Sequence, residues 1–242
     1  MHWFPSLSLF SGFSGLAVDR LGEVYILDTP FGIVRKFDPD GNPVLTFGGL
    51  GNGSGKFQSP AGIAESTTGD ILVTDPSLGL IQEFTPSGVF VSQWVAAGGG
   101  LPTGIAADDS GFVFVTNRSI FVKAVTVYNA AHQYVRTIGT FGIGVGDFSN
   151  PGGITVMPNG IIVVSDDERM KLLAFSRTGT FLFEWGSNGA APDQFNRPSY
   201  LTHDALGNLY VSDSGNNRVV KYGPGPVPTV RKSWGAVKAS YR

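Results

Sequence analysis

The apolar residues of this chain fall in short runs that end at a polar turn and then restart, and this pattern recurs along the sequence. The clearest copy is NLYVSD, then SGNN, then RVVKY, at residues 208–222. The first run is rich in β-branched and aromatic residues, which favours a buried strand. Gly and Asn in the middle tolerate the left-handed backbone of a tight turn. The stretch therefore predicts a β-hairpin.

The same hairpin is predicted at residues 23–37, 70–84, 112–128 and 161–175. Three positions keep one common spacing through all the copies: an apolar residue, a Gly after it, and the polar residue that ends the next strand. Repeats of about 40–50 residues are typical of propellers and solenoids. The strand-ending residues are Asp28, Asp75, Asn117, Asp166 and Asp213.

Each copy holds two further strand-like segments, such as GLAVD before the first hairpin and TFLFEWG after the fourth. D-x-x-G and P-D-G turns join them to the hairpin. Four antiparallel strands per repeat describe a propeller blade. We therefore predict an all-β fold, a β-propeller of four-stranded antiparallel blades with five blades. The blades are expected at residues 13–49, 57–97, 101–142, 148–188 and 195–235.

The repeat array is continuous, so we expect one domain over residues 1–242. Two strand-like extensions, 1–12 and 236–242, remain beyond the blades. They can seal the ring, form part of a sixth blade that is partial or shared, or pair with another molecule by strand addition. A six-bladed ring is therefore the alternative architecture.

The fifth copy, FNRPSYLTHDALGNLYVSDSGNNRVVKYGPG, resembles an NHL repeat. The resemblance extends over residues 13–235 and is most specific in F-x-x-P, G-I-A and D-x-x-N-N-R-V. It implies a β-propeller. Related propellers include protein-binding and RNA-binding modules, sensor domains of bacterial receptors, and a few lyases and hydrolases. The fold therefore does not choose a function.

Composition removes several kinds of chemistry. The chain has no Cys, which excludes disulfides, thiol catalysis and thiolate metal sites. Its histidines, His2, His132 and His203, occupy unrelated repeat positions, so no zinc ligand set is evident. No apolar run is long enough for a membrane-spanning helix. We predict no catalytic residue, no metal and no cofactor. The compartment stays open, with a lean towards extracellular or periplasmic.

Charge is distributed unevenly along the chain. The net charge is −2, yet every charged residue from Arg218 to Arg242 is basic, which leaves the rest of the chain more acidic. A basic strip can bind polyanions or the acidic body of a neighbouring copy, and it can also be a solvated edge strand protected against aggregation. Its candidate partner residues are Arg231, Lys232 and Lys238. The acidic balance of the chain disfavours nucleic acid as a partner.

Two further groups of residues are candidates for a partner surface. Phe31, Ile33, Leu78 and Leu80 stand in hairpin turns where the fifth copy has polar residues, which indicates an apolar interaction patch. Alternatively, these side chains fold back over neighbouring strands. Tyr200 replaces a Gly of the other copies, and His203 lies in the strand expected to line the channel. An imidazole packed between blades is the alternative for His203.

The repeated strand-ending residues are expected to be structural, because an Asp at that place accepts backbone N–H groups of the next turn. Asn217 and Arg218 belong to the same motif and are expected to brace the turn. We therefore predict a non-catalytic interaction or structural module whose partner is a protein, including self-assembly with other copies through the terminal strands. The alternatives are a metal-dependent hydrolase or lyase at the channel mouth, which rests on the fold and His203, and an RNA-binding propeller.

Overall fold

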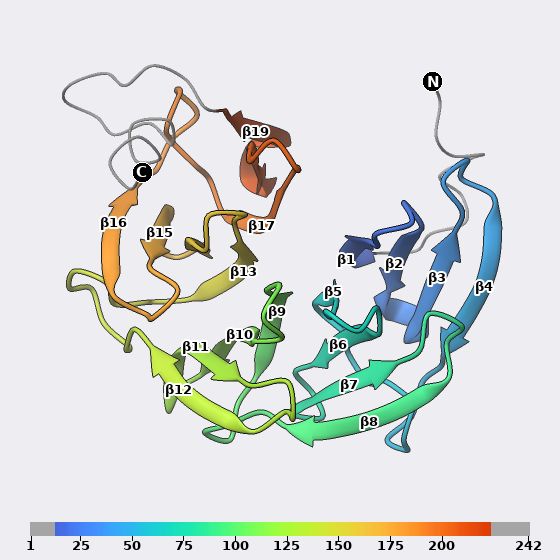
Figure 1. The fold of residues 1–242 in the computed structure, drawn as a ribbon. Helices are drawn as coiled ribbons and strands as arrows, with labels where there is room; N and C mark the ends of the chain where they lie inside the picture. The colour runs from blue at the N-terminus through green and yellow to red at the C-terminus, as the bar shows by residue number, and fades with distance from the viewer. Residues whose placement is uncertain (1–12, 224–242) are drawn as a thin grey trace. The chain divides into compact units, whose positions relative to one another are not determined.

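The structure is a computed structural model, and it describes residues 13–223. The strands form antiparallel sheets in which neighbours follow chain order (Figure 1). The first sheet holds β1 (Phe13–Val18), β2 (Val24–Asp28), β3 (Ile33–Phe37) and β4 (Pro43–Gly48), and the second holds β5 (Ile63–Glu65), β6 (Ile71–Asp75), β7 (Leu80–Phe84) and β8 (Phe90–Val95). The third sheet holds β9 (Pro102–Ala107), β10 (Val113–Ser119), β11 (Val122–Tyr128) and β12 (Tyr134–Ile138), and the fourth holds β13 (Pro151–Val156), β14 (Ile162–Asp166), β15 (Lys171–Phe175) and β16 (Phe181–Trp185).

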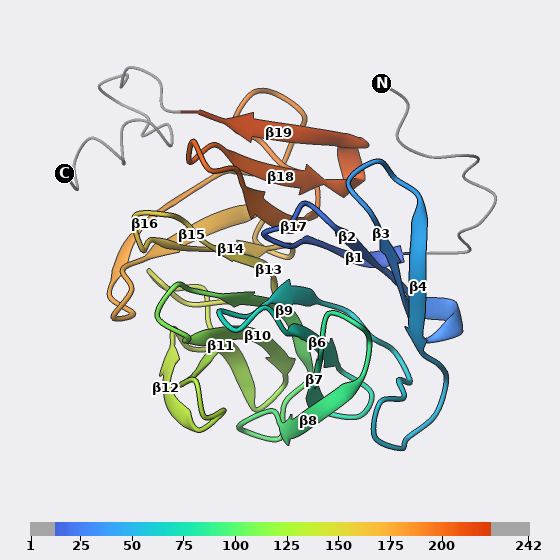
Figure 2. The ribbon, with the colours of Figure 1, turned by 45° about the vertical axis from the view of Figure 1, so that its right-hand side comes forward.

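The fifth sheet has three described strands, β17 (Pro198–His203), β18 (Leu209–Asp213) and β19 (Arg218–Tyr222), which lie side by side in Figure 2. The fourth strand predicted for it, TVRKSWG, lies outside the described residues. The prediction of an all-β propeller with five antiparallel blades is confirmed. Each sheet is one blade.

The predicted hairpins form because the turn residues supply the required backbone conformation. In the first blade, the short 3-10 turn η2 (Thr29–Phe31) ends at Gly32, which has φ 60°. In the fifth blade, η3 (Ser214–Asn216) ends at Asn217, with φ 52°. Gly and Asn are the residues that adopt this left-handed conformation most readily. The turns bring each strand-ending Asp opposite the first residue of the next strand.

The contacts divide the chain into two compact units. The first comprises residues 1–122 and 126–136, and the second comprises 123–125 and 137–242. The division runs through the third blade, because it falls within β11 and β12.

In the first unit, blades bury apolar faces against one another. We call the face that packs on the preceding blade the leading face, and the face that packs on the following blade the trailing face. Tyr25, Leu27 and Val34 on the trailing face of the first blade pack with Ile63 and Val73 of the second. The second blade packs on the third in the same way, through a buried cluster of Leu72, Ile81, Ala96, Ile105, Val113, Val115 and Tyr128.

In the second unit, the fourth blade packs on the fifth through an equivalent cluster. Val163 and Leu172 on the trailing face of the fourth blade meet Phe195, Leu209 and Val211 on the leading face of the fifth. These fully buried side chains each contribute about 1.5–3 kcal/mol of transfer free energy. The blade interfaces are therefore the hydrophobic core of both units.

Hydroxyl groups fasten these interfaces at the first strand of the following blade. Thr74 donates to the carbonyl of Thr103 at 2.6 Å in the first unit, and Ser165 donates to the carbonyl of Ser199 at 2.9 Å in the second. The backbones approach closely there, because a Cβ built on Gly62 would collide with the same Thr103 carbonyl. A side chain on the first strand at the Gly62 position would push the next blade away.

Candidate functional site

The connections that enter the second to fifth blades are each held to the hairpin turn by one buried side chain, a carboxylate or, in the third blade, an amide. In the fourth blade, Asp166 accepts hydrogen bonds from the backbone N–H groups of Ser149 and Asn150 in the incoming connection, at 2.7 and 3.1 Å. It also accepts from the N–H groups of Glu168 and Arg169 in the hairpin turn, at 3.2 and 3.0 Å. One side chain thus joins two loops.

Asp75 has the same arrangement in the second blade, where it accepts from the N–H groups of Gln58, Ser59, Ser77 and Leu78. In the third blade, Asn117 accepts from the N–H groups of Leu101 and Ser119 and donates its amide to the carbonyl of Ala97. The amide can reach because this connection is short and lacks the Phe of the others. In the first blade, Asp28 pairs with Arg35 at 2.9 Å.

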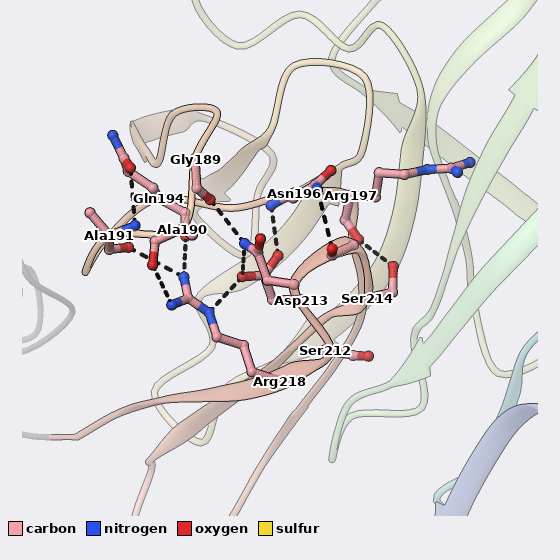
Figure 3. A network of polar contacts seen from close by, with 12 residues as sticks. Gly189, Ala190, Ala191, Gln194, Asn196, Arg197, Ser212, Asp213, Ser214 and Arg218 are labelled. Atoms are coloured by element: carbon pink, nitrogen blue, oxygen red, sulfur yellow. Dashed lines mark hydrogen bonds and ion pairs between the residues drawn. The ribbon is translucent and has the colours of Figure 1, made fainter.

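The fifth blade adds an arginine to this scheme (Figure 3). Arg218 Nε donates to Asp213 at 2.8 Å, and its terminal nitrogens donate to the carbonyls of Ala190, Ala191 and Gln194. Asp213 also accepts from the N–H of Asn196 at 2.7 Å. The guanidinium therefore fixes the whole connection that precedes this blade.

The strand-ending carboxylates are fully buried and already hold several hydrogen-bond donors or an arginine. Their oxygens are therefore engaged with the protein's own turns. Within residues 13–223, no group of three or more His, Asp or Glu could hold a metal ion. The same part of the chain contains no helix with the length and apolarity needed to span a membrane.

Three of the connections share one backbone frame. In each, a fully buried Phe at the end forms a parallel bridge with a residue near the start, and the Phe N–H donates to a carbonyl at the start. The bridges are Leu50↔Phe57, Phe141↔Phe148 and Asn188↔Phe195. The frame is thus independent of the side chains that the loop displays.

The loop before the fourth blade, residues 140–147, displays apolar side chains on this frame. Phe141, Ile143 and Val145 are 64%, 86% and 80% exposed. The loop is well tied, because Asp147 accepts from Thr140 Oγ1 at 2.7 Å and from the Gly144 N–H at 3.0 Å. The equivalent positions are Leu50, Asn52 and Ser54 in one of the other loops, and Asn188, Ala190 and Pro192 in the other.

The fifth blade carries a sequence signature of its own. Residues 195–222 match the NHL repeat. The fifth blade is an NHL repeat. The matched residues run from the buried Phe195 through Asp213 and Arg218 to the end of β19. They are the residues that clamp the connection to the hairpin.

Two mammalian proteins that are named for the NHL repeat are similar to part of this chain. NHL repeat-containing protein 3 of Mus musculus is 33% identical over 103 residues, which cover 39% of this chain and 30% of the relative. The Homo sapiens protein of that name is 30% identical over 107 residues, covering 41% and 31%. The match therefore spans less than a third of either relative's length.

Solved structures share the fold at low identity. A streptogramin B lyase has a TM-score of 0.63 and 15% identity, over 90% of this chain and 66% of that one. A gluconolactonase from Xanthomonas campestris has 0.68 and 13%, over 92% and 78%. A chain of a nidogen/laminin complex has 0.68 and 21%, over 87% and 75%. Similarity at this level shows the propeller fold and leaves the function open.

The apolar turn residues that the sequence singles out are exposed to different degrees in the structure. Phe31 is more than half exposed, whereas Ile33, Leu78 and Leu80 are half-buried at the starts of β3 and β7 or in the turn before β7. The side chains of these turns are therefore largely withdrawn towards their own strands.

Tyr200 and His203 both lie on β17. His203 is half-buried, and its Nδ1 lies 2.9 Å from Oγ1 of Thr155 on β13. Tyr200 is 44% exposed. The basic candidates Arg231, Lys232 and Lys238 lie outside the described residues, as do the terminal extensions.

The sequence analysis did not identify two exposed apolar loops among the described residues. In the first unit, Ile120 and Phe121 at the tip of the β10–β11 hairpin are almost fully exposed. In the second unit, the loop 140–147 displays its three apolar side chains. The available signals were the longer third hairpin, RSIFVK, and the alternation of apolar residues with Gly in FGIGVG, which polar loops do not show.

Proposed function

We propose that this NHL propeller is a non-catalytic protein-interaction module and that loop 140–147 is its contact element for an apolar surface on a partner protein. The observation that carries the proposal is the exposure of Phe141, Ile143 and Val145 on a frame that does not need them. Clustered apolar side chains on a soluble surface mark interaction sites. Lyase and gluconolactonase propellers share the fold, and nothing in the described residues favours either activity.

The loop is rigid enough to present these side chains in one arrangement. A Cβ on Gly144 would lie 2.6 Å from the Asp147 carboxylate, so the carboxylate needs a residue without a side chain there. Lys123 lies over the ring of Phe141, with its Nζ 4.7 Å from the centroid. A contact element that is ordered before binding loses less conformational entropy when it binds.

The test replaces the loop's side chains with those of its counterpart in the first unit. Ile143→Asn with Val145→Ser gives the residues found at Asn52 and Ser54, which the same frame accepts. Tagged wild type and variant are used for affinity capture from cells of the source organism, followed by quantitative mass spectrometry. We expect the proteins enriched by wild type to fall at least tenfold with the variant.

A matched control alters the other loop. Asn52→Ala with Ser54→Ala changes an exposed pair at the equivalent positions and should leave capture unchanged. The same enriched proteins at the same level for wild type and the Ile143/Val145 variant would contradict the assignment of the loop. Self-assembly through the terminal strands is a separate proposal, and those strands lie outside the described residues.

A further inference from the structure

The hairpin turn of the fourth blade places a methionine where other turns have Gly or Asn. Gly32, Gly79 and Asn217 end the turns of the first, second and fifth blades, with φ of 60°, 66° and 52°. Met170 stands at the same position of the fourth blade, with φ 54°. A Cβ is disfavoured in this left-handed conformation, which Gly adopts freely and Asn tolerates. The turn itself therefore gives no reason for a methionine here.

A second left-handed residue lies in the connection that enters the fifth blade. Arg197 has φ 59°, whereas Ser59 and Asn150, which also precede the Pro of F-x-x-P, have no positive φ. The N–H groups of these two residues donate to the strand-ending carboxylate of their own blade. Ser59 donates to Asp75 at 3.2 Å, and Asn150 donates to Asp166 at 3.1 Å. The fifth blade thus departs from the repeat at one backbone donor.

The donor of Arg197 is directed to the preceding blade instead. Its N–H donates to Sδ of Met170 at 3.1 Å, while Asp213 keeps the N–H of the neighbouring Asn196 at 2.7 Å. Met170 and Arg197 belong to the same compact unit. A thioether is a weak hydrogen-bond acceptor compared with a carboxylate. A single sulfur atom therefore ties the turn of the fourth blade to the connection of the fifth.

The two methionines that the structure describes differ in their access to small reagents. Met170 is half-buried, whereas Met157 is 2% exposed and lies in the buried cluster between the fourth and fifth blades. Oxidation of a thioether follows its accessibility. Hydrogen peroxide is little larger than water, so it needs no open face of the molecule to reach a half-buried sulfur. Met170 is therefore the more reactive of the two.

We propose that Met170 is a modification site for peroxides, and that its oxidation releases the connection of the fifth blade from the turn of the fourth. A lone pair of the sulfur attacks one peroxide oxygen, the O–O bond breaks and an S–O bond forms. The sulfur loses two electrons, and the second oxygen leaves as hydroxide and takes the proton of the first to become water. The product is methionine sulfoxide. The proposal is independent of loop 140–147.

Oxidation removes the acceptor that the Arg197 N–H uses. The sulfur of a sulfoxide carries a partial positive charge, so it no longer accepts a hydrogen bond. Sulfur and nitrogen are 3.1 Å apart, and an oxygen added between them would be closer to the nitrogen than the ~2.7–3.2 Å of an N–H···O bond. The Arg197 carbonyl keeps its bond from Ser214 Oγ at 2.7 Å (Figure 3). The release is therefore local and leaves the blade folded.

The test treats the full chain with hydrogen peroxide. Peptide mass spectrometry measures sulfoxide at each methionine, and nuclear magnetic resonance measures solvent exchange of the Arg197 amide proton. We expect Met170 to oxidise at least tenfold faster than Met157, and the Arg197 amide to exchange at least tenfold faster once Met170 is oxidised. A pair of methionine sulfoxide reductases, one for each epimer, should restore the slow exchange.

Met170→Leu is the matched control, since leucine has a similar size and no sulfur. Its Arg197 amide should exchange as fast as in oxidised wild type and should not respond to peroxide. The amide of Val211, which is buried in β18, should stay slow in every sample, because the blade remains folded.

Four results would overturn the proposal. Met170 oxidises no faster than Met157, or the Arg197 amide of Met170→Leu is as slow as in reduced wild type. Alternatively, oxidation leaves the Arg197 exchange unchanged or slows it, which would mean that the sulfoxide oxygen holds the N–H. Finally, exchange of Val211 accelerates together with that of Arg197, which would mean that oxidation unfolds the blade.

Discussion

Asp204 shows how one side chain can order a turn that links two strands. Its carboxylate accepts from the backbone N–H and side-chain amide of Asn208, at 2.8 and 2.6 Å, and from the Tyr210 hydroxyl. The Asn208 side chain is the main reason that the pKa of Asp204 falls to about 2. The charged form is the one that the folded chain prefers.

This shift predicts an acid-dependent loss of stability. Because the folded pKa lies below the ordinary value of 3.8, the stabilisation is fully present above that value and is lost as pH falls towards about 2. We expect the urea midpoint of wild type to fall more steeply over this window than that of Asp204→Asn. The exposed Asp109→Asn should keep the wild-type slope. Equal slopes for wild type and the Asp204 variant would show that the charge is not preferred.

Among the structural elements, each hairpin is stabilised together with the connection that enters its blade. Asp166 joins the two through four backbone donors. Without the carboxylate, buried N–H groups such as that of Ser149 lose their acceptor, and an unsatisfied buried donor costs about 1–3 kcal/mol. The effect on the blade is therefore larger than that of a typical surface residue.

We expect Asp166→Ala to lower the free energy of unfolding by about 3 kcal/mol, measured by urea denaturation. The neighbouring Glu168→Ala removes an exposed carboxylate and should change it by less than about 0.5 kcal/mol. Similar losses for the two variants would mean that net charge, and not the shared hydrogen bonds, sets the stability of this turn.

Arg218 likewise links a hairpin to the connection that enters its blade. It holds the carbonyls of the 189–194 loop, while Gln82 holds the loop before the second blade through the Gly55 N–H and the Lys56 carbonyl. The two blades thus use different side chains for one task.

For the whole molecule, the blades are held by apolar interfaces, carboxylate-tied turns and interblade hydroxyl bonds, and none of these needs a metal ion. We therefore expect EDTA to leave the thermal unfolding midpoint unchanged, as scanning calorimetry would measure. Added calcium or zinc should not restore or raise it. A lower midpoint in EDTA that calcium reverses would reveal a bound ion and reopen the metal-dependent alternatives.

Much of the fold can be predicted from the sequence because its determinants are local. A turn residue such as Gly32 and a strand-ending residue such as Asp75 each act within their own hairpin. The spacing of such residues along the sequence is therefore enough to predict the blades. Exposure is different, since it depends on what packs against a face. Val34 and Val219 are the same residue at the same repeat position, and only the structure separates the buried one from the exposed one.

The candidate site shows the same difference between what residue spacing predicts and what depends on packing. The role of Asp166 as an acceptor follows from where it stands in the turn, whereas the display of Ile143 and Val145 depends on how the loop folds between the backbone bridge of Phe141 with Phe148 and on what packs against it. The turn residues Ile33 and Leu80 looked equally apolar in sequence, yet the strands that they begin withdraw them from the surface.

The shared frame of the three connections separates what keeps the loop folded from what it shows to the outside. Its buried Phe and its backbone bonds carry the fold, while Ile143 and Val145 in loop 140–147 are exposed. Substitutions at those positions can therefore accumulate in a lineage at little cost to stability, so recognition can diverge quickly between homologues while the blades stay the same. In a chain of such repeats, the exposed loop side chains of each blade can change independently, while the packing of the blades stays the same.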